Sequence, residues 1–150
     1  VAWYECMNIG MSGGEIYRRV TDAFEGTAIQ SKLNPGHLIS YDEWMHSPIR
    51  PDSTDKIRSG MIFQTDIIPT PLPPGKALNC EDTIAIADKV LRTNIRTTFP
   101  EMYARIQARR DFMINDLGIQ LDESILPLTD GTAYFSPFWL LSELVCTVSR

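Results

Sequence analysis

Three polar side chains stand where apolar strand residues are expected, and their types suit metal chemistry. His37 follows a Pro-Gly turn, Asp66 lies inside the apolar run 61–68, and Glu81 opens a run of strand-forming residues. Burying a carboxylate inside an apolar strand is costly unless a cation or hydrogen bonds offset its charge. Two carboxylates with one imidazole form a ligand set that first-row divalent metals accept.

The alternation of side chains along a strand decides which of these residues share a face. In an extended chain Asp66 shares a face with Gln64, and Glu81 shares one with Asn79 and Thr83. If the two strands pair, the two carboxylates and the imidazole of His37 converge. The residues leave a second interpretation open, in which the carboxylates lie at an edge or in a loop and His37 is a turn histidine.

Two segments show the apolar spacing of helices. A capping-box pattern of Ser12 with Glu15 begins an amphipathic helix over about residues 13–26. A second capping-box spacing at residues 98–101 begins a helix that ends near Gly118. An apolar stripe is expected along this second helix, made of Tyr103, Ile106, Met113, Ile114 and Leu117. Its solvated face is expected to carry Arg105, Arg109 and Arg110.

The strands occupy the middle of the chain. Strand composition covers residues 61–68 and 78–87, and residues 37–49 look extended. The proline-rich run 69–75 cannot pair in a central sheet, because proline lacks the amide donor. Helices and strands are mixed without regular βαβ alternation. This mixture predicts an α+β domain with an antiparallel sheet and flanking helices.

Composition narrows the classes of function. The chain has 150 residues with 14 Lys or Arg and 19 Asp or Glu, hence a net charge of −5. This acidic balance argues against a nucleic-acid binder. No apolar run reaches the roughly 18 residues that span a bilayer, so no membrane association is expected. Three widely spaced cysteines without a Cys-x-x-Cys pair indicate free thiols, and we expect a cytoplasmic location.

The order of the motifs carries more information than any one of them. The chain has Pro-Gly-His at 35–37, Gly-Met-Ile-Phe-Gln-Thr-Asp at 60–66 and Glu-Asp-Thr at 81–83. This order resembles the C-terminal half of the pita-bread metallohydrolases, the family of aminopeptidase P, prolidase, methionine aminopeptidase and creatinase. The resemblance covers residues 1–90 as half of a pita-bread catalytic domain. Residues 91–150 are then a C-terminal extension, helical and irregular.

The resemblance implies a role for each matching residue. His37 matches the metal-ligand histidine, Asp66 stands where the family has a ligand glutamate, and Glu81 matches the glutamate that bridges two metals. His46 matches a second histidine that assists catalysis outside the metal shell. The chain departs from the pattern, because Asp66 is one methylene shorter than glutamate. The family's two ligand aspartates are also absent, since Asp22 is the only aspartate before His37.

The function implied by the resemblance is hydrolysis of peptide bonds near an N-terminus, or of small C–N-bonded substrates, by water activated between two divalent ions. The metals implied are Mn, Co, Zn or Fe. We expect the chain to be a fragment that is inactive by itself and whose partner is the N-terminal half of the domain. Its exposed apolar face is expected to make it a homo-oligomer. The alternative is a non-catalytic peptide- or protein-binding module.

Overall fold

The computed structural model describes residues 1–39, 47–76, 79–129 and 144–149. Within these residues the fold is α+β, with antiparallel sheets and flanking helices, as the sequence predicts. A four-stranded antiparallel sheet of described residues has the order β2-β3-β5-β6. Its strands are β2 (His37–Leu38), β3 (Ile62–Ile67), β5 (Cys80–Ile86) and β6 (Ile125–Pro127).

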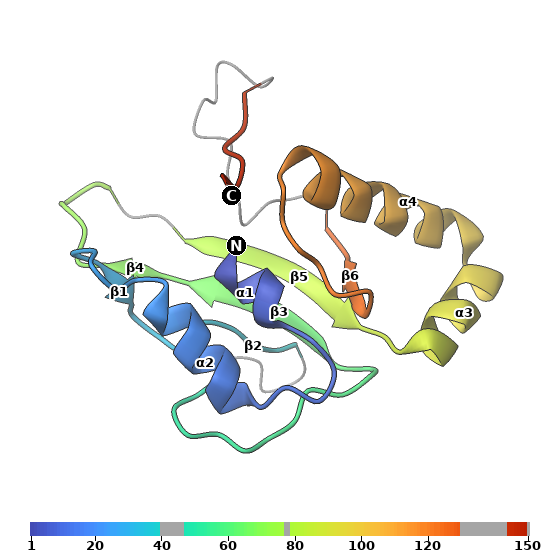
Figure 1. Cartoon of the computed structure of the whole chain (residues 1–150), viewed down its shortest axis with the longest axis horizontal. Helices are drawn as coiled ribbons and strands as arrows, with labels where there is room; N and C mark the ends of the chain where they lie inside the picture. The colour runs from blue at the N-terminus through green and yellow to red at the C-terminus, as the bar shows by residue number, and fades with distance from the viewer. Residues whose placement is uncertain (40–46, 77–78, 130–143, 150) are drawn as a thin grey trace.

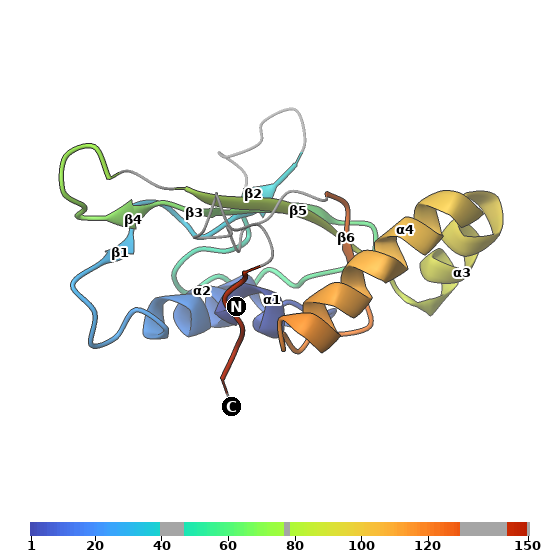
Figure 2. The same cartoon turned by 90° about the horizontal axis from the view of Figure 1, so that it is seen from above.

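The helices α1 (Ala2–Cys6) and α2 (Gly13–Asp22) cover one face of this sheet (Figure 1), and the sheet seen edge-on has both on the same side (Figure 2). We call this side the helix face. Its apolar residues form the main core and include Trp3, Ile16, Val20, Phe63 and Ile84. The opposite side carries His37, Gln64, Asp66, Glu81 and Thr83, and we call it the polar face.

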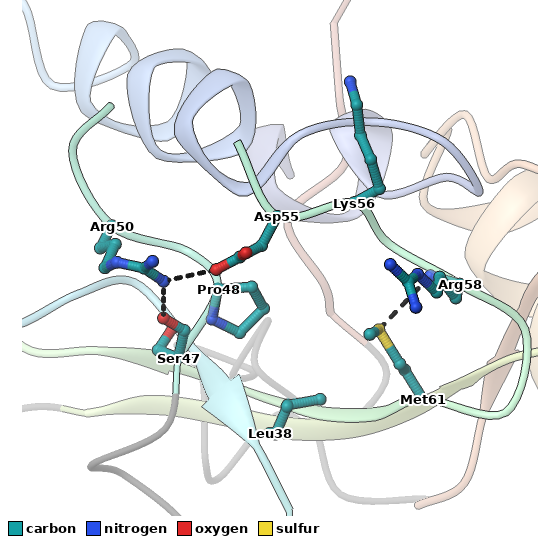
Figure 3. Close-up of a pocket in the computed structure, with 8 residues that line it drawn as sticks. All are labelled: Leu38, Ser47, Pro48, Arg50, Asp55, Lys56, Arg58 and Met61. Carbon is teal, nitrogen blue, oxygen red and sulfur yellow. Dashed lines mark hydrogen bonds and ion pairs between the residues drawn. The ribbon is translucent and has the colours of Figure 1, made fainter. Parts of the chain in front are cut away.

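A loop over residues 47–58 packs against the connection between α1 and α2. The amide of Gly13 donates to the carbonyl of Asp55 at 2.9 Å. A Cβ atom at Gly13 would lie 1.8 Å from the carbonyl oxygen of Pro48, so a side chain has no room at that position. Across the loop, Arg50 pairs with Asp55 at 2.8 Å (Figure 3). These contacts fix the loop against the helix face.

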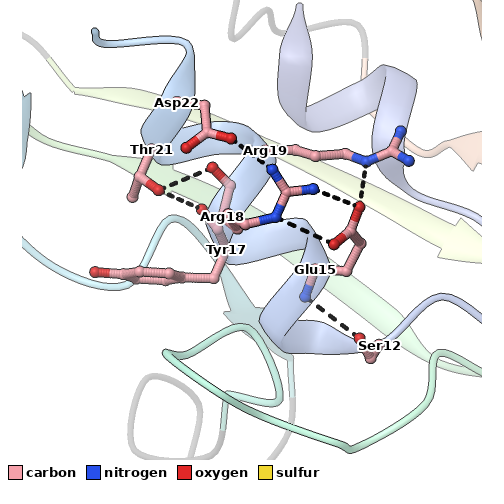
Figure 4. A network of polar contacts seen from close by, with 7 residues as sticks. All are labelled: Ser12, Glu15, Tyr17, Arg18, Arg19, Thr21 and Asp22. Carbon is pink, nitrogen blue, oxygen red and sulfur yellow. Dashed lines mark hydrogen bonds and ion pairs between the residues drawn. The ribbon is translucent and has the colours of Figure 1, made fainter.

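Helix α2 begins where the sequence predicts and ends before the predicted residue 26. The Ser12 hydroxyl accepts from the Glu15 amide at 3.3 Å, which confirms one half of the capping box. The Glu15 carboxylate turns instead to Arg18 at 2.8 Å and Arg19 at 2.9 Å (Figure 4). The solvent-facing side of α2 therefore carries exposed ion pairs, whereas Ile16 and Val20 on its opposite side are buried.

A helical hairpin lies beyond β6 at one end of the sheet (Figure 2). It consists of α3 (Lys89–Thr98) and α4 (Pro100–Asp111). The predicted helix after residue 98 is confirmed as α4, whereas α3 was not expected. The second capping box was wrong, because the N-cap of α4 is Phe99 and makes no side-chain capping bond.

The chain after α4 widens into a π-helical turn, η2 (Phe112–Asp116). A wider turn rotates the residues that follow relative to an α-helix. Met113 and Leu117 are buried as predicted, but Ile114 is exposed rather than part of the apolar stripe. Gly118 follows with φ of 76°, which fits its predicted place at a helix end.

The basic run of α4 was only partly interpreted correctly. Arg110 is buried and not solvated. Its guanidinium donates to the backbone carbonyl of Asp122 at 3.0 Å and to that of Ile125. The hydrogen bonds to two carbonyls offset the cost of burying this cation, and they tie α4 to the start of β6.

The proline-rich run stays out of the central sheet, as expected. Its first residues form β4 (Pro69–Thr70), which pairs with β1 (Gln30–Ser31) in a separate ribbon. Among the helices that the structure describes, none is long and apolar enough to cross a membrane.

Candidate functional site

The sheet register brings the predicted ligands to one face. Asp66 of β3 lies opposite Glu81 of β5, and His37 of β2 lies opposite Gln64 of β3. Directly opposed residues of an antiparallel pair point to the same side of a sheet. His37, Asp66 and Glu81 therefore share the polar face, as their strand alternation predicts.

His37 is positioned by the preceding residue, Gly36, whose backbone lies close to the Gln64 carbonyl of β3. Gly36 has φ of 130°, and a Cβ atom there would lie 2.8 Å from the carbonyl oxygen of Gln64 and 2.9 Å from Nε1 of Trp3. A residue with a side chain fits neither the conformation nor the space. The Pro-Gly turn thus brings β2 against β3, and the His37 side chain is left only 8% exposed.

The hydrogen bond made by His37 Nδ1 determines whether Nε2 of the neutral ring carries a hydrogen or a lone pair. His37 Nδ1 lies 2.9 Å from the carbonyl oxygen of Leu38. A carbonyl only accepts, so Nδ1 carries the hydrogen and the Nε2 of the neutral ring carries a lone pair. Metal-binding histidines are oriented in this way. His37 Nε2 lies 4.0 Å from Asp66 Oδ2, so a lone pair faces the carboxylate when the ring is neutral, and the two groups form an ion pair when the ring is charged.

The carboxylate of Asp66 is only partly satisfied by hydrogen bonds from the described residues. Its side chain is 15% exposed, and its Oδ1 is buried with no hydrogen-bond partner among the described residues. Burial raises the pKa of the Asp66 carboxyl, the nearby Glu81 carboxylate raises it further, and His37 acts in the opposite direction. Both raising causes disfavour a bare negative charge, which a proton or a bound cation would offset.

Glu81 is held differently. Its Oε2 accepts from the Gln64 side-chain amide at 2.8 Å, and its Oε1 accepts from the Asn79 amide at 3.1 Å. Within the described part of the chain, no group of three His, Cys, Asp or Glu side chains is arranged to hold a metal ion. His37 and Asp66 therefore provide two donor groups, one fewer than such a group needs. Glu81 must break its hydrogen bond to Gln64 or to Asn79 before its carboxylate can act as a third ligand.

Two other residues considered from the sequence do not add to this cluster. Asp22 bonds Arg18 at 2.7 Å on the exposed side of α2 (Figure 4), on the helix face of the sheet. It therefore does not replace a missing aspartate ligand. His46, the predicted catalytic histidine, lies outside the described residues.

The buried carboxylate Asp82 was missed by sequence reasoning. It lies on the helix face, 4% exposed, directly behind the polar face. The Tyr4 hydroxyl donates to its Oδ2 at 2.5 Å, while the Thr83 amide at 2.8 Å and the Thr129 hydroxyl donate to its Oδ1. The signal was the strand alternation of Glu-Asp-Thr, which puts the aspartate on the opposite side from Glu81.

A cavity of about 500 Å³ opens beside the His37–Asp66 pair. His37 and Asp66 line it together with Tyr17, Lys32 and Asn34. This volume falls within the range of small-molecule pockets, roughly 300–1,000 Å³. A peptide-sized group with polar atoms has room next to His37 and Asp66.

Comparisons with known proteins do not assign a family. A scan against protein-family models finds no match to this chain, and a search of the curated proteins finds no relative. What the protein does is therefore inferred from the polar face and its adjoining cavity.

Proposed function

We propose that the chain is part of a divalent-metal-dependent hydrolase, as the C-terminal half of a pita-bread-like domain that cleaves peptide bonds near an N-terminus. The main support is the 4.0 Å separation between His37 Nε2 and Asp66 Oδ2, with Asp66 Oδ1 unpartnered among the described residues. Ligand atoms on one first-row ion lie about 3–3.5 Å apart at ordinary bond lengths. A small rotation of either side chain brings them to that separation.

Each residue of the polar face has a role in this proposal. His37 offers the Nε2 lone pair, and its bond to the Leu38 carbonyl holds the ring in place. Asp66 supplies a negative charge that its burial and the nearby Glu81 disfavour. Glu81 supplies a second carboxylate once it exchanges Gln64 or Asn79 for the ion. A bound divalent ion supplies Lewis acidity, which polarises a carbonyl and acidifies water.

The site is incomplete by the standard of the family that the sequence resembles. That family has two additional aspartate ligands, and the single aspartate ahead of His37 is committed to Arg18. We therefore expect the 150-residue chain to bind one ion weakly and to have no peptidase turnover. A second polypeptide segment that brings carboxylates to the polar face is the partner this proposal requires.

The experiment is a peptidase assay coupled to thermal unfolding. The chain is incubated with an Ala-Pro-Ala tripeptide and Mn²⁺, Co²⁺ or Zn²⁺, in parallel with His37→Ala and with Asp55→Asn, whose site is the distant loop. We expect no turnover, and a metal-induced rise in Tm that His37→Ala removes and Asp55→Asn retains. Turnover that depends on His37 contradicts the proposed inactivity. A Tm that no metal changes contradicts the metal centre.

A non-catalytic peptide- or protein-binding module is the second candidate. The hydrogen bonds that Glu81 accepts from the Gln64 and Asn79 side-chain amides support it, because they occupy the carboxylate that a metal centre would use. This candidate predicts that the tripeptide binds in the presence of EDTA and that Asp66→Asn leaves binding unchanged. Tripeptide binding that requires Mn²⁺ and is lost in Asp66→Asn favours the hydrolase.

A further inference from the structure

A second cavity lies on the other side of β2 from His37. Its volume is about 550 Å³, and it lies between the loop 47–58 and the edge of the sheet. Leu38, which follows His37 and is opposite Phe63 in the register, forms part of its wall. The cavity therefore opens toward the helix face and is separate from the polar face.

The charges around this cavity are unbalanced toward positive. Arg50, Lys56 and Arg58 line it, against the single acid Asp55. Arg50 is already committed, since one of its nitrogens donates to Asp55 at 2.8 Å and to the Ser47 carbonyl at 3.0 Å. Arg58 therefore has no acidic partner among the described residues that line the cavity. Such a concentration of cations contrasts with the net charge of −5 of the whole chain.

The orientations of the cationic side chains differ. Figure 3 shows the Arg58 guanidinium directed toward the middle of the ring of lining residues, above Met61. In the same view the Lys56 side chain points away from Leu38 and Met61. Arg58 is thus placed to meet a ligand in the cavity, and Lys56 lies on its rim.

The remaining wall of the cavity is apolar. Leu38, Pro48 and Met61 contribute it, with Pro48 beside Arg50 and Asp55 and Met61 beside Arg58 (Figure 3). A site with a guanidinium at one end and apolar side chains along the wall suits a ligand with one anionic head and an apolar body. An inorganic anion alone would leave the apolar wall without a contact.

The backbone that carries the charged residues is held in place. The Ser47 hydroxyl donates to the Gly36 carbonyl at 2.6 Å and is buried. At the other end of the loop, the Ile57 amide donates to the Met11 carbonyl at 2.9 Å. The side chain of Ile57 is buried in the main core. The cavity is therefore preformed, which lowers the entropy cost of binding.

We propose that this cavity binds a small amphiphilic anion, a carboxylate or phosphate monoester on a medium-length alkyl or similarly apolar chain. Arg58 pairs with the anionic head, and Leu38, Pro48 and Met61 contact the apolar body. The site is independent of the proposed metal centre, because its lining shares no residue with the His37–Asp66 cavity.

The test is isothermal titration of the whole chain with octanoate and with octyl phosphate, in EDTA. We expect saturable binding of at least one of them, and the tighter of the two identifies the head group. Arg58→Gln should raise the Kd about tenfold, as loss of a charge-assisted bond does. Lys89→Gln on α3, which does not line the cavity, is the matched control and is expected to change the Kd less than about twofold.

Two further ligands separate the contributions of head and body. Octanol and inorganic phosphate should both bind much more weakly than the amphiphile, and high salt should weaken octanoate binding. Circular dichroism of Arg58→Gln verifies that the variant is folded. Absence of binding by both amphiphiles overturns the proposal. So does binding that Arg58→Gln leaves unchanged, or inorganic phosphate binding as tight as that of octyl phosphate.

Discussion

Two carboxylates on neighbouring strands of the same sheet have opposite surroundings. Asp82, on the helix face, accepts hydrogen bonds from the Tyr4 hydroxyl, the Thr83 amide and the Thr129 hydroxyl. Asp66, on the polar face, has an oxygen with no hydrogen-bond partner among the described residues, and burial raises its pKa. The same chemical group is thus satisfied on one face and unsatisfied on the other.

The difference lies in the hydrogen-bond partners that each carboxylate meets. A buried carboxylate that meets donors joins the elements that supply them, here α1 and the segment after β6 to β5. Asp66 has an Oδ1 without a hydrogen-bond partner among the described residues and an Oδ2 that lies 4.0 Å from His37, so a proton or a bound cation would stabilise it. Burial alone would not separate the two carboxylates, whereas the hydrogen-bond partners do.

The largest expected effect comes from removing the satisfied carboxylate. Asp82→Ala removes the hydrogen bonds that Asp82 accepts from the Tyr4 hydroxyl, the Thr83 amide and the Thr129 hydroxyl, each of which contributes roughly 1–3 kcal/mol. We expect a loss of about 3–5 kcal/mol in the free energy of unfolding, measured by urea denaturation. Asp66→Ala should lose less than about 1 kcal/mol. Equal losses from the two variants would contradict the contrast between the faces.

Packing of the helix face gives the next largest effect. Gly13→Ala places a methyl group 1.8 Å from the Pro48 carbonyl oxygen, which is backbone and cannot rotate away. We expect a loss of about 2–3 kcal/mol in the same denaturation experiment. Thr83→Ala on the polar face is the comparison, with an expected loss below about 1 kcal/mol. A Gly13→Ala variant as stable as the unmodified chain would show that the loop 47–58 is not fixed.

A smaller effect isolates one bond of the Asp82 network. Tyr4→Phe removes only the hydroxyl that donates to Asp82, and the ring keeps its place in the core. We expect a loss of about 1.5–2 kcal/mol, as for a hydrogen bond to a charged group. In the Asp82→Ala background the same substitution should cost much less, because its partner is already gone. Additive losses in the double variant would show that the two residues are not coupled.

The smallest effect has the opposite sign and depends on pH. The folded-state pKa of Asp66 is raised, so its penalty is absent below the unfolded-state pKa and complete above the folded-state pKa. Asp66→Asn in EDTA should therefore raise Tm by about 1–3 °C at pH 7. The gain should shrink as the pH falls and disappear only well below the unfolded-state pKa of about 3.9, where both states carry a proton. Calorimetry across this range checks the prediction, and a lower Tm for Asp66→Asn at pH 7 would contradict it.

The sequence predicts the strands of the polar face well, because alternation and register depend on local patterns. The runs 61–68 and 78–87 become β3 and β5, and their pairing sets Asp66 against Glu81. Helix α3 was missed although its signals are in the sequence. Asp88 caps it by accepting from the Leu91 amide. Leu91 and Ile95, at helical spacing, pack against Ile106 and Leu126. β6 is three residues long and ends in proline, which is too little pattern to detect.

Side-chain partners were harder to predict than elements. The burial of Arg110 depends on carbonyls that lie 12 and 15 residues further along the chain. The partner of Asp82 on α1 is 78 residues away. Strand alternation placed Gln64 and Asn79 on the polar face, but it did not show that their side-chain amides hydrogen-bond to Glu81. Contacts of this kind arise from the three-dimensional packing, which single-sequence patterns do not encode.

The central claim is that His37 and Asp66 form a cation site on the polar face. Its most direct test is a Mn²⁺ titration of the chain, with free Mn²⁺ measured by electron paramagnetic resonance. The prediction is one bound Mn²⁺ per chain, with a Kd at least about tenfold weaker in both His37→Ala and Asp66→Asn and unchanged in Asp55→Asn. Absence of binding, or binding that both site variants retain, would contradict the claim.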